Sequence, residues 1–477
     1  MAALIVEQLL ILDATELAAM LAKRTITSVS LVERLLEQIS LHDKPRNLRA
    51  VLSKFAPRDT LIKAASQLDD ERAQGRLRGP LHGIPILIKD AINTHPSLGM
   101  PTTLIKKGLI ILAKTNLNEF CNWKGFNSVN GFSVVGGQTN SAYINGGLKD
   151  GEAVMGRSPP GSSTGSAVGV SAGYSPIALG TETDESSVKV DGVWTLSHRF
   201  DAIGGMAKSV TDLAIITELL HTDQVRSKLP TGGYLSSLSK SFEGLKVGFL
   251  DPAIWHLPES LCPQIPSVVQ ELNEAYEQAI EKVEASGARV EYPVPLPSCD
   301  KLTMPDGDMT AMEVVILREY SRNIGQCLGI LQDCNVRTAA ELIAWNEEHA
   351  EIEMPFDNAN QQRLIQACKE RPTAERYEEA RRHMKKVVIE DGFEPLLSGK
   401  GLDPIAVPQD SNIASMATAS GYPIATMPLG VLKDYGRPFG LAIMARAGRE
   451  DILFTFMSAF EATFPKRVIP TSLLQPI

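Results

Sequence analysis

Apolar residues in the N-terminal part of the chain recur at helical spacing. One stripe lies between Asp13 and His42, and it consists of Leu31, Val32, Leu35, Leu36 and Ile39. Asp13 and Glu16 have the spacing of a capping box, in which each side chain caps the backbone of the other residue. We therefore predict two helices between Asp13 and His42, and a third over roughly residues 60–74.

Short apolar runs follow these helices, and each run ends in a polar loop. Residues 84–88 end at Lys89 and Asp90, residues 109–113 end at Lys114-Thr115-Asn116, and residues 177–179 end at Gly180-Thr181. Strands that alternate with helices in this way are typical of an α/β sheet with its site at the strand ends. We predict strands at these three runs, together with an α/β fold.

The pattern continues in the second half of the chain. Residues 245–250 and a run that begins near Val290 are predicted strands. Between them we predict a helix with one apolar face, formed by Val269, Leu272, Tyr276, Ala279 and Val283. Residues 371–389 carry charges of both signs, which indicates a helix with a solvated outer face.

Composition narrows the class of protein. The chain has 477 residues, of which 43% are hydrophobic, enough to fill a sizeable core. Its net charge of -9 provides no basic surface for nucleic acid. The six cysteines are scattered without zinc-site spacing, which favours a reduced, metal-free interior. The apolar stretch 2–12 lacks a basic region and is too short to span a bilayer, so we expect a cytoplasmic protein without a membrane span.

The segment from Pro159 to Ser166 is rich in glycine and serine, and small residues follow it up to Gly173. Such a loop is more often a flexible connection than a site, and no Gly-Lys-Ser/Thr follows to make it a phosphate-binding loop. Lys89 changes this interpretation, because a lysine directly after a hydrophobic strand is expected to be buried. Together, the two features point to a serine and lysine site.

Several motifs, in order along the chain, resemble the amidase signature family. They are Gly83 to Asp90, Lys114 to Phe120, Gly136 to Thr139, Gly161 to Ala167, Gly204 to Val210, and the tail from Asp403 through Gly421-Tyr422-Pro423, Pro428-Leu429-Gly430 and Gly436 to Gly440. The resemblance implies a single large α/β domain over 1–477, with a mixed twisted central sheet covered by helices on both faces. Its parts would be N-terminal helices at about 13–75, a signature core at about 79–220, a variable region at about 240–400, and the rest of the core at about 401–470.

The resemblance also implies a Ser-cisSer-Lys triad that cleaves amides through an acyl-enzyme. Ser186 would be the nucleophile, Ser162 the bridging serine after a cis peptide bond, and Lys89 the base, which acts only when neutral. Backbone N–H groups of the turn before Ser186 would form the oxyanion hole; its residues are Thr183, Asp184 and Glu185. The implied substrate is a small-molecule amide, with no cofactor and no metal, and a homodimer is left open.

The chain departs from the family pattern in three places. Glu185 stands where the family has glycine before the nucleophile, which adds a side chain and a negative charge near the oxyanion. A core tract that normally follows the nucleophile is absent after Ser187. A connecting helix is expected to be missing between Met100 and Leu109. These departures support an alternative, a catalytically impaired protein of the same fold with a binding or scaffold role. A Ser-His-Asp hydrolase is disfavoured, because no Gly-x-Ser-x-Gly elbow surrounds Ser186.

Overall fold

The computed structural model describes residues 4–52, 56–94, 99–126, 130–144, 147, 161–182, 192–259, 262, 264–331, 333–356, 359–434 and 436–475. Four helices open the chain: α1 (Val6–Ile11), α2 (Ala14–Ala22), α3 (Ser28–His42) and α4 (Arg58–Ala73). The predicted capping box is present, since the Asp13 carboxylate accepts the Glu16 N–H at 2.7 Å and the Glu16 carboxylate accepts the Asp13 N–H at 3.0 Å. The predicted N-terminal helices are therefore confirmed.

The first sheet contains the predicted strands that end in polar loops. Its order is β2-β1-β5-β6, with β1 (Pro85–Lys89), β2 (Ile110–Thr115), β5 (Ile177–Glu182) and β6 (Ala202–Ala207). β1 is parallel to both β2 and β5, and β6 is antiparallel to β5. The carboxyl ends of the three parallel strands consequently lie at one edge of the sheet, and helix α6 (Thr164–Ser171) packs beside them.

One sequence expectation about this sheet is wrong. We expected the helix between β1 and β2 to be missing, but α5 (Gly99–Lys106) occupies that position. Parallel strands need a crossover connection, and a helix of 8 residues is long enough to supply it here. The turn at its end uses Gly108 at φ 87°, which glycine adopts readily.

The second sheet is built from the later part of the chain. Its order is β10-β11-β9-β7-β8, with β7 (Lys246–Phe249), β8 (Arg289–Glu291), β9 (Ile405–Pro408), β10 (Ile424–Val431) and β11 (Pro438–Met444). A short pair, β3 (Phe132–Ser133) and β4 (Gly137–Gln138), stands apart. The α/β fold is confirmed, and apart from the β3–β4 pair the described strands form two mixed sheets, where one central sheet was expected.

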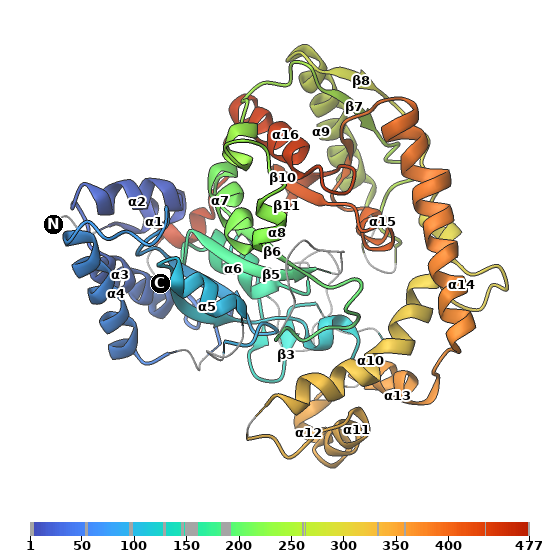
Figure 1. Ribbon diagram of the computed structural model, residues 1–477, viewed down its shortest axis with the longest axis horizontal. Helices are drawn as coiled ribbons and strands as arrows, with labels where there is room; N and C mark the ends of the chain where they lie inside the picture. The colour runs from blue at the N-terminus through green and yellow to red at the C-terminus, as the bar shows by residue number, and fades with distance from the viewer. Residues whose placement is uncertain are drawn as a thin grey trace.

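Helices join and cover the sheets. α7 (Val210–Leu220) and α16 (Glu450–Thr463) lie near the junction of the two sheets (Figure 1), and Leu213 of α7 packs against the apolar cores of both. α9 (Pro266–Ala285) covers the second sheet with the predicted Tyr276, Ala279 and Val283 buried. Its apolar face is rotated slightly from our expectation, because Val268 is fully buried while Val269 is only partly so.

A helical lobe lies on the side of the molecule opposite the N-terminal helices (Figure 1). It contains α10 (Ala311–Gly329), α11 (Ala339–Glu348), α12 (Ala350–Glu353), α13 (Gln362–Lys369) and α14 (Ala374–Met384). α14 continues as a wider helical stretch over 385–393, and α8 (Asp223–Arg226) and α15 (Ile413–Ser420) complete the α-helices in the described ranges. The charged helix predicted here is present, with Ala380, Met384 and Val388 on its buried face.

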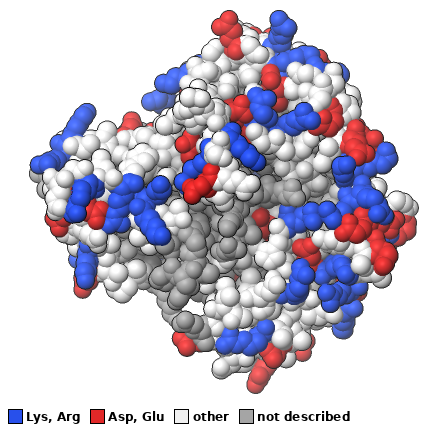
Figure 2. All heavy atoms as spheres, in the orientation of Figure 1, with Lys and Arg blue, Asp and Glu red and all other residues white. Residues whose placement is uncertain are grey.

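Charges of both signs are interspersed over the face shown in Figure 2. Within the described ranges, no helix combines the length and apolarity needed to cross a membrane.

Candidate active site

Lys89 is the last residue of β1 and is completely buried. Its Nζ donates hydrogen bonds to two hydroxyls, Ser162 Oγ at 2.7 Å and Thr181 Oγ1 at 2.6 Å. Apolar neighbours along β1, among them Leu87 and Ile88, are buried as well. Lys89 therefore lies at the end of a hydrophobic strand, and its amine contacts the hydroxyl groups of Ser162 and Thr181. The contact with Ser162 joins two residues of the triad that the family resemblance implied.

The sheet topology explains how these three residues meet. β1 pairs with β5 in parallel, with Ile88 opposite Leu179, so Lys89 and Thr181 both lie at the carboxyl-terminal edge. Ser162 comes from the loop that enters α6. Side chains from the strand ends and from a neighbouring helix N-terminus thus converge where α/β folds commonly place their sites.

The segment around Ser162 is firmly anchored. The Gly161–Ser162 peptide bond is cis, which is the conformation that the family resemblance implied for the bridging serine. The Ser163 hydroxyl donates to the Thr181 carbonyl and accepts from the Thr181 N–H, both at 3.2 Å. Ser166 donates to the Leu179 carbonyl at 2.8 Å. The described part of this glycine-serine run is held against β5, so it is not the flexible connection that such a composition alone would favour.

Close backbone packing explains one of the glycines in this run. A Cβ at Gly165 would lie 2.3 Å from the Ala50 carbonyl oxygen and 2.5 Å from the Asn116 nitrogen. The Gly165 N–H donates to the Asn116 carbonyl at 3.0 Å. A larger residue would force α6 away from the end of β2, so the small residue keeps Ser162 near the strand ends.

The other predicted site residues cannot be placed. Ser186, Thr183, Asp184 and Glu185 fall outside the described residues. Of the predicted triad, the structure therefore brings together Lys89 and Ser162. In the part of the chain that the structure describes, no cluster of three His, Cys, Asp or Glu side chains could hold a metal ion.

Comparisons with known proteins relate the chain to amidases. The Amidase family profile matches residues 30–189. The chain is 27% identical to the "Probable amidase" of Arabidopsis thaliana, over 92% of this chain and 87% of the relative. It is 28% identical to the crystal structure of a peptide amidase from Stenotrophomonas maltophilia, with a TM-score of 0.82 over 96% of this chain and 98% of the other. An amidase family protein from Bacillus anthracis shares the fold at 20% identity, with a TM-score of 0.80 over 97% of this chain and 93% of the other.

The chain belongs to the amidase signature family. It is accordingly assigned to the amidase class of hydrolases.

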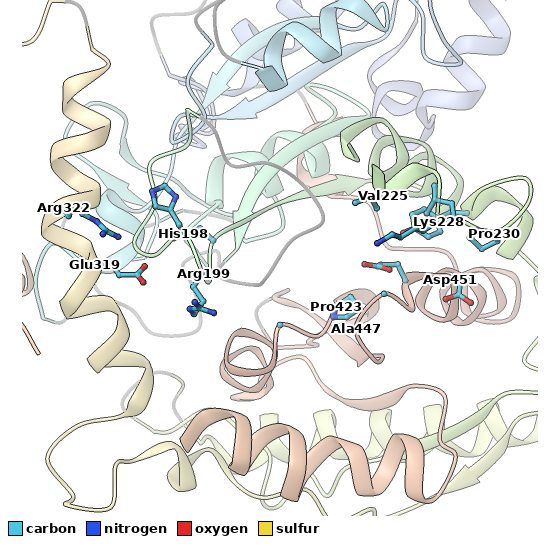
Figure 3. A pocket seen from close by; sticks show the side chains of 16 residues that line it. His198, Arg199, Val225, Lys228, Pro230, Glu319, Arg322, Pro423, Ala447 and Asp451 are labelled. Carbon is cyan, nitrogen blue, oxygen red and sulfur yellow. The ribbon is translucent and has the colours of Figure 1, made fainter. Parts of the chain in front are cut away.

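A pocket in this amidase family member lies beside the turn before β6, and its described lining does not include Lys89, Ser162 or Thr181. It has a volume of about 750 Å³, and Figure 3 shows His198, Arg199, Glu319 and Arg322 on one side with Lys228 and Asp451 on the other. Asp201 also lines it and immediately precedes β6. Because Ala202 pairs with Glu182 at the end of β5, this wall of the pocket continues from the strand that carries Thr181.

Asp201 is a functional candidate that the sequence analysis did not identify. Its side chain is 4% exposed, and its Oδ2 accepts the Ser197 N–H at 2.8 Å. Burial raises the pKa of Asp201 to about 7, although the hydrogen bond from the Ser197 N–H acts in the opposite direction. No motif marked this residue, because its environment is created by segments that are distant in sequence.

Other polar contacts organise the same wall of the pocket. Glu319 on α10 is almost fully buried, and its carboxylate accepts hydrogen bonds from Ser197 Oγ at 2.7 Å and from the Tyr377 hydroxyl. Arg199 donates to the same Tyr377 hydroxyl at 3.5 Å. The helical lobe therefore contributes part of the pocket wall and fixes the turn that leads to Asp201.

The lobe also contacts the loop that follows β2. Lys124 is buried, and its Nζ contacts the carboxylates of Glu119 at 2.7 Å and of Glu353 at 3.0 Å. Asn360 is hydrogen-bonded in both directions to the backbone of Phe126, at 3.0 and 2.9 Å. The loop after β2 is thus held to α12 by an ion pair and to the segment before α13 by two hydrogen bonds.

Proposed function

We propose that the protein hydrolyses a carboxylic amide to an acid and an amine or ammonia through a Ser-cisSer-Lys triad. The observation that supports this proposal most strongly is the 2.7 Å contact between Lys89 Nζ and Ser162 Oγ at the strand ends. In the proposal, Lys89 is the base, Ser162 the bridging serine and Ser186 the nucleophile. The assignment of Ser186 rests on the sequence motif.

The reaction would begin with proton transfer away from the nucleophile. Neutral Lys89 takes the proton of Ser162, and Ser162 takes the proton of Ser186 while Ser186 Oγ forms a bond to the amide carbon. The carbon–nitrogen bond of the tetrahedral intermediate then breaks, and the leaving nitrogen receives a proton from Ser162, which is reprotonated by Lys89. The product of this half-reaction is an ester between Ser186 and the acyl group.

Water completes the cycle by the same route in the second half-reaction. It loses a proton to Ser162 and Lys89, attacks the ester carbon, and releases the acid as Ser186 Oγ regains a proton. Backbone N–H groups in the turn formed by Thr183, Asp184 and Glu185 would stabilise the negative oxygen of each intermediate. A well-placed donor of this kind contributes roughly 3 kcal/mol.

We propose the pocket beside Asp201 as the place where substrate binds. Its lining includes charged side chains from both walls, such as Arg199, Glu319, Lys228 and Asp451. A lining of this kind suits a polar amide better than a long hydrocarbon chain. The similarity to a structure named a peptide amidase makes short peptide amides the first class to assay.

The sequence around the nucleophile supports a second candidate function. Glu185 replaces the glycine that the family has before the nucleophile, and a core tract after Ser187 is absent. In this alternative, the protein keeps the fold and the pocket but binds amide-containing molecules without turning them over.

A serine-directed fluorophosphonate separates the two functions. The wild-type protein is expected to be labelled, the Ser186→Ala variant not to be labelled, and the Ser162→Ala variant to be labelled far more slowly. Hydrolysis of short peptide amides and small primary amides, followed by ammonia release, then identifies the substrate class. A wild-type protein that neither reacts with the probe nor releases ammonia would contradict the hydrolase and favour the binding function.

A further inference from the structure

Asn118 contacts both residues of the Gly161–Ser162 peptide unit. Its backbone N–H donates to the Ser162 carbonyl at 3.0 Å, and its carboxamide lies against the Cα of Gly161. We propose that Asn118 is a positioning residue, which holds Ser162 so that Oγ stays within hydrogen-bonding distance of Lys89. This inference rests on the proposed function, because it assigns Asn118 a role in proton transfer through Ser162.

The carboxamide of Asn118 is itself fixed by hydrogen bonds on every side. It is 1% exposed. Its Nδ2 donates to the Oδ1 atoms of Asn122 and Asn130, each at 2.8 Å, and its Oδ1 accepts the Gly131 N–H. Both donor hydrogens and the acceptor are therefore used, which leaves the side chain one orientation, with its amide nitrogen toward Gly161.

The backbone after Asn118 turns in an unusual way that supports these bonds. Phe120, Cys121 and Asn122 have positive φ values of 51°, 52° and 70°, a region that residues other than glycine seldom adopt. This left-handed turn places the Asn122 side chain against that of Asn118. An intrinsically unfavourable backbone conformation thus allows the hydrogen bonds among the carboxamides of Asn118, Asn122 and Asn130.

Gly161 complements the carboxamide. A Cβ at this position would lie 2.0 Å from Nδ2 of Asn118 and 2.6 Å from its Cγ, far inside any contact distance. Because three hydrogen bonds hold the Asn118 carboxamide, it cannot move away from a Cβ at position 161 without breaking them. An alanine at 161 would instead displace the peptide unit that carries Ser162, so the two positions are expected to be coupled energetically.

A double-mutant cycle with Asn118→Ala and Gly161→Ala tests this coupling on short peptide amides. Asn118→Ala is expected to lower kcat by about 10- to 100-fold with KM changed less than about threefold, since Ser162 acts in the chemical steps and not in substrate binding. Gly161→Ala is expected to lower kcat at least tenfold. In the double variant, Gly161→Ala should lower kcat little beyond the effect of Asn118→Ala, because the carboxamide that collides with the new Cβ has been removed.

Asn346→Ala serves as the matched control. Asn346 on α11 is also buried, and its carboxamide donates to the Gln361 carboxamide at 3.0 Å, away from the strand ends. Both Asn346→Ala and Asn118→Ala are expected to unfold at a lower temperature than the wild type, but in Asn346→Ala kcat should stay within about twofold of the wild type. The positioning role would be overturned if the kcat losses of Asn118→Ala and Gly161→Ala simply multiply in the double variant. It would also be overturned if Asn346→Ala lowers kcat as much as Asn118→Ala.

A crystal structure of Asn118→Ala provides a readout that does not depend on turnover. The Lys89 Nζ to Ser162 Oγ distance is expected to exceed 3.5 Å, and an unchanged distance together with unchanged kcat would overturn the inference. If the wild-type protein has no amidase activity, the proposed function fails. This distance then decides by itself whether Asn118 positions Ser162.

Discussion

Lys89 Nζ donates to Thr181 Oγ1 at 2.6 Å, almost the same distance as to Ser162. The lysine is therefore held from β5 as well as from the loop before α6. In Thr181→Val the side chain keeps its shape but loses this acceptor, and the amine can turn away from Ser162. We expect kcat to fall roughly tenfold, the effect of one hydrogen bond of about 1–1.5 kcal/mol.

Steady-state hydrolysis of a peptide amide measures the effect of Thr181→Val. Thr217→Val is a suitable control, because the Thr217 hydroxyl donates to the Leu213 carbonyl within α7 at 2.8 Å. Equal activity of Thr181→Val and the wild type would show that Ser162 alone is enough to hold Lys89.

Removing the lysine should have a much larger effect. Lys89→Ala is expected to lower kcat/KM on the order of 10³-fold or more, since no other base contacts Ser162 among the described residues. Lys246→Ala is a matched control on a strand of the second sheet, where Nζ donates to the Lys400 carbonyl and pairs with Glu291. Fluorophosphonate labelling that proceeds at the wild-type rate in Lys89→Ala would exclude Lys89 as the base.

Glu185 is expected to oppose catalysis by placing a negative charge and a bulky side chain beside the oxyanion. Glu185→Gly should therefore raise the rate of amide hydrolysis, by roughly tenfold or more where the surroundings exclude water. Glu185→Gln separates the two causes, because it removes the charge and keeps the size. If both variants match the parent rate, the tract missing after Ser187 must be restored before the comparison is repeated. A slower Glu185→Gly variant would instead mean that the glutamate takes part in the reaction.

Asp201 makes folding depend on pH. Burial raises its pKa to about 7, whereas an aspartic acid in the unfolded chain ionises near pH 3.9. Between about pH 4 and 7 the folded protein therefore binds the extra proton, so the free energy of unfolding contributed by this group falls as pH rises. The loss across this window is on the order of a few kcal/mol.

Chemical denaturation from pH 4 to 8 measures this contribution. Asp201→Asn is expected to make the free energy of unfolding less dependent on pH. Asp70→Asn changes an exposed position on α4 and is expected to leave this pH dependence unchanged. The interpretation fails if the slopes of Asp201→Asn and the wild type are the same.

The sequence predicts local elements of this fold well. Apolar runs identified the strands that end at Lys89 and Thr115, because a buried strand requires such a run. The capping box at Asp13 identified the start of α2, since it depends only on residues 3 positions apart. Lys89 and Ser162 were recognised from local motifs, and the structure places their side chains in contact.

Features that depend on distant segments were not predicted. The division into two sheets depends on pairing between strands far apart in the chain, such as β7 with β9. α5 was missed because the expectation came from family length and not from the short helical segment itself. Thr181 and Asp201 gain their significance only when β1, β5 and the turn before β6 are brought together.

The buried ion pair of Lys124 has a consequence for synthesis of the chain. Its partner Glu353 lies 229 residues later in the sequence. At a translation rate of about 5–20 residues per second, roughly 10 to 50 s pass before the ribosome adds this partner. Until then, the loop after β2 has only Glu119 to balance the lysine. We therefore expect the loop after β2 to reach its final structure only late in translation, after Glu353 has been added.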